Sequence, residues 1–207
     1  MISAPNPGAA RPPEGGQSSL GRPGERLGSV KAITLASSDF ELFGVPARFA
    51  QDRAALDARW KDLQREAHPD KFAAQAAAAQ RLAMQWSVRI NEAYQRLKDP
   101  LKRAAYLCGL AGVPVDAENN TAMPAKFLMQ QMEWREELDA ATSAAEVDAL
   151  NAQVLDEKRE VLRCCEDLLD MRHDYVQAVG QVRSLMFIER FCRDLETRLE
   201  HFEALAR

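Results

Sequence analysis

The pentapeptide HPDKF at residues 68–72 separates two segments that share a helical pattern of apolar residues. Apolar side chains recur every three or four positions before it, at Leu56, Trp60, Leu63 and Ala67. The same rhythm returns between about Ala78 and Lys98, at Leu82, Trp86, Ile90, Ala93 and Leu97. Such spacing places the apolar side chains on one face of an α-helix. Two helices joined by about ten residues predict an antiparallel hairpin.

Two shorter helices are expected on either side of this hairpin. One covers residues 40–43 and ends at Gly44, and the other begins at Pro100 and is closed by Gly109 and Gly112. Proline is favoured at the first position of a helix, and glycine is favoured just past its end. Residues 38–112 are therefore predicted to form one helical domain.

The chain after Pro124 contains no further proline and a single glycine, Gly180. Its richness in Leu, Ala, Glu and Arg favours long helices, which we place at 124–141, 143–171 and 173–205. Short connections between long helices predict an antiparallel three-helix bundle. The predicted fold class is all-α, with a helical hairpin domain followed by this bundle.

Proline and glycine also set the remaining domain boundaries. Residues 1–37 hold 5 of the 10 prolines and 6 of the 10 glycines, so we expect a disordered tail there. The stretch 113–123 is expected to link residues 38–112 to a second domain at 124–207. No apolar run reaches the ~20 residues that span a bilayer, and no secretory signal is present, so a cytoplasmic protein is expected.

Charge and cysteine content narrow the classes of partner. Residues 38–112 carry 12 basic and 9 acidic side chains, whereas residues 123–207 carry 11 and 18, so the two domains are expected to have different partners. With a sequence pI near 5.5 and no basic stripe, nucleic acid is not an expected partner. The four cysteines show no CxxC spacing, so we expect no metal and no cofactor.

The HPD tripeptide has the physical character of a recognition loop. Pro69 fixes its own φ angle and disfavours helical geometry at His68, which ends the first helix. Asp70 would then project from a rigid turn, where its carboxylate could accept a bidentate hydrogen bond from a partner's arginine. Lys61, Arg65 and His68 line one solvent-facing side of the helix. We interpret this side as a basic docking face, although a merely solvated helix face has the same pattern.

A second stretch, INEAYQRLKDP at residues 90–100, completes a resemblance to the J-domain. In J-domains the HPD loop and the preceding helix contact the ATPase domain of a DnaK-type chaperone and promote ATP hydrolysis. The resemblance implies the same roles here, carried by His68, Pro69, Asp70, Lys61 and Arg65. A J-protein has no catalytic site of its own, so the chain is not expected to be an enzyme.

The rest of the chain resembles one family of J-proteins. It has no Gly/Phe-rich linker and no CxxCxGxG repeats, and an acidic helical bundle follows the J-domain directly. This arrangement resembles HscB, a co-chaperone of iron–sulfur cluster biogenesis, over residues 38–207. The stretches that carry the resemblance are FELFG at 40–44, LQR at 63–65, HPDKF at 68–72, and FLM at 127–129 through REELD at 135–139. The tail lacks the cysteines of eukaryotic relatives, so a bacterial form is expected.

The helix expected from Pro124 carries two opposed apolar stripes. Phe127, Trp134 and Leu138 share one direction, and a Leu/Met group lies on the far side. The second stripe could pack on a neighbouring helix or form an exposed binding surface. In the HscB family an IscU-type scaffold protein binds this surface. The positions that match it are Leu128, Met129, Met132, Glu133, Glu136 and, on the last helix, Phe187.

The resemblance implies an adaptor that delivers the iron–sulfur scaffold to a DnaK/HscA-type chaperone and stimulates its ATPase. Two alternatives remain at this point. One is a J-protein that holds unfolded hydrophobic clients for a general DnaK-type chaperone. The other is an all-helical enzyme that uses His68 and Asp70 as acid and base, although no nucleophile or metal set accompanies them.

Overall fold

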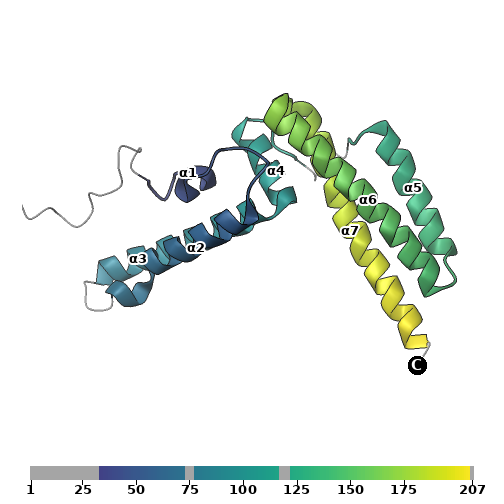
Figure 1. Ribbon diagram of the computed structural model, residues 1–207, viewed down its shortest axis with the longest axis horizontal. Helices are drawn as coiled ribbons and strands as arrows, with labels where there is room; N and C mark the ends of the chain where they lie inside the picture. Colours follow the sequence, from purple (N-terminus) through teal and green to yellow (C-terminus); the bar gives the residue numbers. More distant parts are fainter. Residues whose placement is uncertain (1–32, 73–76, 117–121, 206–207) are drawn as a thin grey trace, which may run out of the picture. The chain divides into compact units, whose positions relative to one another are not determined.

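The computed structural model describes residues 33–72, 77–116 and 122–205, and every regular element in these ranges is helical, as Figure 1 shows. The elements in chain order are α1 (Asp39–Phe43), α2 (Arg53–Ala67), the short 3₁₀-helix η1 (Pro69–Phe72), α3 (Ala77–Lys98), α4 (Pro100–Leu110), α5 (Ala125–Ala140), α6 (Ala144–Glu166), the π-helix η2 (Asp167–Met171) and α7 (Tyr175–Leu205). The all-α prediction is therefore confirmed. The expected tail up to residue 32 lies outside the described residues.

The hairpin of α2 and α3 is built on the predicted apolar faces, with one exception. Leu63, Ile90 and Leu97 are buried, and the Trp60 ring stacks on Tyr94 at 4.8 Å between centroids. Leu82, expected in the core, is 49% exposed. A spacing of four residues drifts by about 40° per step on an α-helix, so two steps from Ile90 carry Leu82 about 80° away from the core direction.

A buried carboxylate that the sequence did not reveal ties α1 to α3. Asp39 is fully buried, and its two carboxylate oxygens form ion pairs with Arg89 at 2.7 Å and Arg96 at 2.8 Å. Its backbone N–H donates to the Tyr106 hydroxyl at 3.0 Å, which brings in α4. Arg89 also donates to the carbonyl of Ser37 at 2.8 Å. Residues 33–37, which we had assigned to the tail, therefore include a turn held against α3.

Helix boundaries follow the expected capping chemistry in most places. Ser38 caps α1 and Gly44 ends it with a φ of 65°, a left-handed conformation that favours glycine. Pro100 is the first residue of α4. Gly109 lies inside α4 rather than at its end, and Gly112, with a φ of 79°, follows the helix. One glycine thus ends the helix while the other is helical.

Helices α5, α6 and α7 pack as the expected bundle. The stripe predicted for the middle helix is buried throughout, at Val147, Leu150, Val154, Val161, Cys165 and Leu168. Trp134 of α5 is 1% exposed and stacks on Phe191 of α7 at 5.8 Å. The last turn of the helix expected to run to residue 171 is the π-helix η2, and α7 begins at Tyr175.

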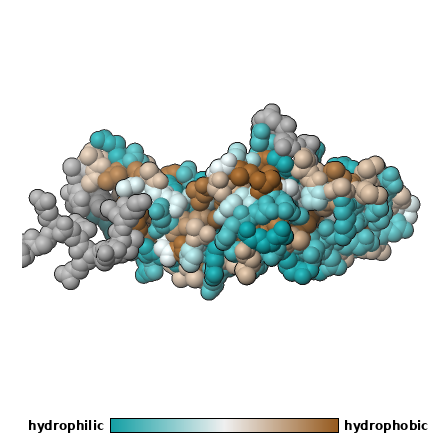
Figure 2. Space-filling model, turned by 90° about the horizontal axis from the view of Figure 1, so that it is seen from above, coloured by the Kyte–Doolittle hydropathy of each residue, from teal (hydrophilic) through white to brown (hydrophobic). Residues whose placement is uncertain are grey.

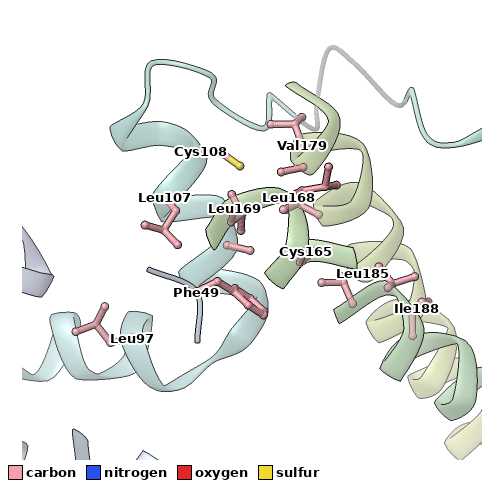
Figure 3. Close-up of a cluster of buried hydrophobic side chains, with 14 of the residues drawn as sticks. Phe49, Leu97, Leu107, Cys108, Cys165, Leu168, Leu169, Val179, Leu185 and Ile188 are labelled. Atoms are coloured by element: carbon pink, nitrogen blue, oxygen red, sulfur yellow. The ribbon is translucent and has the colours of Figure 1, made fainter. Parts of the chain in front are cut away.

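The apolar core continues from the hairpin region into the bundle. Figure 3 shows Phe49, Leu107 and Cys108 beside Leu168 and Leu169 of η2 and Val179 of α7. Polar contacts reinforce this packing, because the Asp170 carboxylate accepts the backbone N–H groups of Phe49 at 2.5 Å and Ala50 at 2.8 Å. The segment before α5 is also attached to the bundle. Arg183 of α7 donates to the carbonyls of Val115 at 2.7 Å and Ala122 at 3.1 Å.

Candidate functional site

The HPD loop lies between α2 and α3, where the sequence places it. His68 leaves helical geometry with a φ of −61° and a ψ of 127°, and Pro69 begins the short helix η1. The N–H of Lys71 donates to the His68 carbonyl at 3.1 Å, which closes the turn. The residue before a proline is biased toward this extended conformation. The loop is therefore a defined turn at the end of a rigid helix.

The Asp70 side chain points into solvent. It is 89% exposed, and His68 is 56% exposed. The His68 Nδ1 accepts the Asp70 backbone N–H at 3.3 Å and lies 3.5 Å from its carboxylate. A carboxylate that is exposed yet fixed at its backbone can accept both donors of a partner's guanidinium with little loss of conformational freedom.

The two basic residues predicted beside the loop are also exposed. Lys61 and Arg65 lie on the solvent side of α2, opposite Leu56 and Leu63 in the hairpin core. Arg65 forms an ion pair with Asp62 one turn away, at a position where both side chains remain largely exposed. Exposed pairs of this kind contribute about 0.3–0.5 kcal/mol, so a partner's carboxylate can compete for Arg65 at little cost. The structure thus brings Lys61, Arg65 and the HPD loop to one end of the hairpin.

A second candidate surface lies on α5. Leu128 is 37% exposed, Met129 67% and Met132 62%, although large apolar side chains usually gain by burial. With about 100° per residue, these three and the exposed Glu133 and Glu136 fall within an arc of about 140°. We call these five residues the α5 surface.

The opposite side of α5 supplies the bundle core. Phe127 is 4% exposed and meets the Trp134 ring edge-on at 5.9 Å. The helix therefore has two apolar sides, one buried against α6 and α7 and one exposed to solvent in the described residues. The second stripe is therefore not packed on a neighbouring helix among the described residues, and its role as a binding surface stays a prediction.

Phe187, the sixth residue expected at this surface, is half-buried. Its ring meets Phe127 edge-on at 5.8 Å and stacks on Phe191 at 5.8 Å. The guanidinium of Arg135 lies 5.3 Å from the centre of the same ring. Phe187 is thus part of an aromatic cluster at the edge of α5. Spacing on α7 alone could not reveal this, because the position of Phe187 depends on the α5–α7 pairing.

Metal-ligand clusters and cysteine thiols are two further kinds of reactive group that the described residues could present. No group of three or more His, Cys, Asp or Glu side chains among the described residues is arranged to hold a metal. Burial raises the pKa of the Cys108 thiol to about 11 and that of Cys165 to about 12, so neither is a reactive thiolate near neutral pH.

On the face in Figure 2, hydrophobic residues form separate patches among hydrophilic ones. None of the described helices is long and apolar enough to cross a membrane.

Comparisons with known proteins identify relatives over most of this chain. Residues 123–196 match the model of the HSCB C-terminal oligomerisation domain. This range contains α5, α6, η2 and most of α7. The co-chaperone protein HscB homolog of Burkholderia multivorans is 51% identical over 174 residues, covering 83% of this chain and 99% of the relative. The homolog of Burkholderia cenocepacia is 50% identical over the same length and the same shares of both chains.

Solved structures give the same result. The chaperone HscB from Vibrio cholerae is 34% identical and superposes with a TM-score of 0.69, over 80% of this chain and 99% of its own. The human co-chaperone protein HscB, at 24% identity, shares the fold with a TM-score of 0.73, over 89% of this chain and 92% of its own.

Proposed function

Because this chain belongs to the HscB family of co-chaperones, we propose that it binds an IscU-type iron–sulfur scaffold protein and delivers it to a DnaK/HscA-type chaperone. In this role it stimulates the ATPase of that chaperone through the HPD loop. In this proposal the hydrolysis takes place in the partner, and the co-chaperone acts by shifting the conformational equilibrium of that partner. We place this function in the bacterial cytoplasm; the relatives from Burkholderia support the bacterial part of this proposal.

One observation carries the proposal: the α5 surface leaves three large apolar side chains in water, on the same chain as an exposed HPD loop. Leu and Met side chains adapt to the shape of a folded partner, since they are flexible and polarisable. Glu133 and Glu136 flank them and can pair with basic side chains at the rim of an interface. A folded scaffold would bury this surface while the HPD loop, on another element, stays available.

Replacing Leu128, Met129 and Met132 together by serine tests the scaffold-binding surface. Each apolar side chain contributes about 1.5–3 kcal/mol when it is fully desolvated, so we expect affinity for the scaffold to fall by about 100-fold or more. Phe187 is left unchanged, because its contacts with Phe127 and Phe191 would make its loss a stability effect. Calorimetry gives the affinity, and urea unfolding of the same preparation gives the stability.

A control replaces Leu155 by serine, since this residue is 40% exposed and belongs to α6 rather than to the α5 surface. We expect it to retain the affinity of the unchanged protein. Full affinity in the triple variant would reject the α5 surface as the binding site. A collapsed urea midpoint would show that these side chains stabilise the fold.

The HPD loop is tested by Asp70→Asn, which keeps the shape of the side chain and removes its charge. A residue 89% exposed contributes little to stability, so we expect an unchanged melting temperature and loss of ATPase stimulation. Asp148→Asn, at another exposed carboxylate, should stimulate normally. A folded Asp70→Asn protein that still stimulates the chaperone would reject the assigned role of the loop.

The alternative role, a holder of unfolded hydrophobic clients, gives a different result in the same assays. Unfolded chains should compete weakly and broadly for the α5 surface, whereas a folded scaffold should bind one defined patch. Two results together would favour that alternative. Scaffold would not change the stimulation of the chaperone ATPase, and many unfolded proteins would displace scaffold from the α5 surface.

A further inference from the structure

The Asp170 carboxylate joins η2 to the loop before α2 through two hydrogen bonds. Its Oδ1 accepts the N–H of Phe49 at 2.5 Å and its Oδ2 accepts the N–H of Ala50 at 2.8 Å, across about 120 sequence positions. A carboxylate that accepts one N–H on each oxygen fixes both the distance and the direction of the peptide it holds. We refer to this contact as the Asp170 clamp.

The same peptide is also held from its other side. Arg103 of α4 donates from Nε to the Phe49 carbonyl at 2.7 Å, and its guanidinium lies 5.0 Å from the centre of the Phe49 ring. Arg103 is 7% exposed and Phe49 is 5% exposed, so solvent contributes little to either contact. Burial lowers the pKa of Arg103, while the charges of Asp99 and Asp170 oppose this shift. The loop before α2 is thus fixed by one acid from the bundle and one base from α4.

The clamp acts on the helix that carries the HPD loop. Ala50 lies two residues before Asp52, whose side chain caps α2 by accepting the N–H of Ala54 at 2.8 Å. From there α2 runs 15 residues to the loop, a length of about 22 Å at 1.5 Å per residue. An α-helix of this length transmits a displacement at its start to its far end.

The element that presents Asp170 has an unusual local structure. Asp170 lies in η2, where the end of α6 changes from an α-helix to a π-helix. Such π-helical turns are rare and occur frequently at functional sites. Leu168 and Leu169 of the same turn are buried in the core beside Phe49, as Figure 3 shows. The backbone of η2 is therefore anchored by packing, which leaves the Asp170 carboxylate fixed toward the loop.

From these contacts we infer that Asp170 is a positioning residue, which couples scaffold bound at the α5 surface to chaperone activation at the HPD loop. The inference rests on the proposed function. The clamp sets where the HPD loop lies relative to the bundle, so that one chaperone molecule meets both the loop and the bound scaffold. Without the clamp, the α5 surface still binds scaffold and the HPD loop still binds the chaperone. The additional ATPase stimulation that comes from presenting both to one chaperone molecule is lost.

The test replaces Asp170 by asparagine, which keeps the size of the side chain but turns an amide N–H₂ toward one of the two backbone donors. The matched control is Asp167→Asn in the same turn, where the carboxylate pairs with the neighbouring Arg172 at 3.6 Å and is 56% exposed. We expect both variants to bind scaffold, and to stimulate the chaperone without scaffold, within about twofold of the unchanged protein. Saturating scaffold should raise the chaperone ATPase rate with Asp167→Asn by as much as with the unchanged protein. With Asp170→Asn, this scaffold-dependent increase should be at most about a third as large.

A structural readout separates this inference from the proposed function. Nitroxide labels on bio-orthogonal side chains at Glu66 of α2 and Glu200 of α7 report the distance between the hairpin and the bundle, and both positions are exposed. We expect one narrow distance distribution in the unchanged protein and in Asp167→Asn, and a broader one in Asp170→Asn. Faster amide exchange at Phe49 and Ala50 would verify that the clamp has opened. An Asp170→Asn protein with an opened clamp, a narrow distribution and full scaffold-dependent stimulation would overturn the inference.

Two further outcomes are also decisive. A proportional loss of scaffold affinity, basal stimulation and scaffold-dependent stimulation would show that Asp170 serves stability alone and would likewise overturn the inference. Should Asp170→Asn fail to fold, Asp170→Glu keeps the charge one methylene further out, and the same three measurements apply to it. If the unchanged protein neither binds scaffold nor stimulates the chaperone, the proposed function fails, and the label distances then decide the positioning role alone.

Discussion

Replacing Asp39 by asparagine removes a negative charge from a site where two guanidinium groups depend on it. The carboxylate is fully buried, and Arg89 and Arg96 reach it at 2.7 and 2.8 Å. Removing one partner of a buried ion pair costs about 3–5 kcal/mol, because the remaining charge loses its compensation. The side chain of Arg96 is 39% exposed, so water recovers part of this loss. We therefore expect the free energy of unfolding to fall by about 3 kcal/mol.

Urea unfolding at neutral pH measures this change, since an unchanged m-value shows that the same surface is exposed on unfolding. For a chain of this length, about 1 kcal/mol shifts the melting temperature by about 2–4 °C, so the expected shift is about 6–12 °C. Asp148→Asn, at an exposed carboxylate of α6, is the control and should change stability by less than about 0.5 kcal/mol. A loss below about 1 kcal/mol in Asp39→Asn would refute the argument that this carboxylate holds α1 on α3.

Two further predictions concern backbone conformation and buried thiols. Gly109→Ala should stabilise the protein by about 0.5–1 kcal/mol, since the position is helical with nothing within 4 Å of the added Cβ, whereas Gly112→Ala should destabilise it because its φ is 79°. Thermal unfolding of both variants measures this difference, and equal effects would contradict it. Because folding raises the pKa of Cys108 to about 11 and of Cys165 to about 12, the unfolded chain loses these protons first as the pH rises. The stability from these thiols is complete below the ordinary thiol pKa of about 9.0 and declines above it, by about 3 kcal/mol at pH 10 for the pair. A variant with both cysteines changed to alanine should lack this component, and parallel pH profiles for the two proteins would contradict the assignment.

The elements could be predicted from the sequence because each carries a local signal. The period of the apolar residues indicates α2, α3 and α6, and Pro100 indicates the start of α4. The exceptions arise where the signal is not local. Leu82 fits the i, i+4 pattern but lies too far around α3 to reach the core. The Asp39 ion pairs join residues 50 and 57 positions apart, and spacing along the chain carries no information about such pairs.

For the candidate surfaces, too, features within one helix could be predicted and contacts between helices could not. Lys61, Arg65 and the HPD loop follow one another along the chain, and all the described side chains among them are exposed as expected. The five residues of the α5 surface share one helix face, so their common exposure also follows from helical periodicity. Phe187 lies on another helix, and its half-buried place against Phe127 depends on how α5 and α7 pair. Whether these residues bind the proposed partners stays a prediction.

Trp134 lies on α5 directly behind the surface assigned to the scaffold, 1% exposed and stacked on Phe191. Its indole N–H is buried without a hydrogen-bond partner in the described residues, whereas the indole of Trp60 donates to Asn91 at 2.9 Å. The two rings therefore lie in different electrostatic surroundings, and the emission of an indole depends on those surroundings. With Trp60 and Trp86 changed to phenylalanine, the fluorescence of Trp134 would report any shift of α5 as a partner docks. The protein thus contains its own optical probe, and a titration could be followed without attaching a dye.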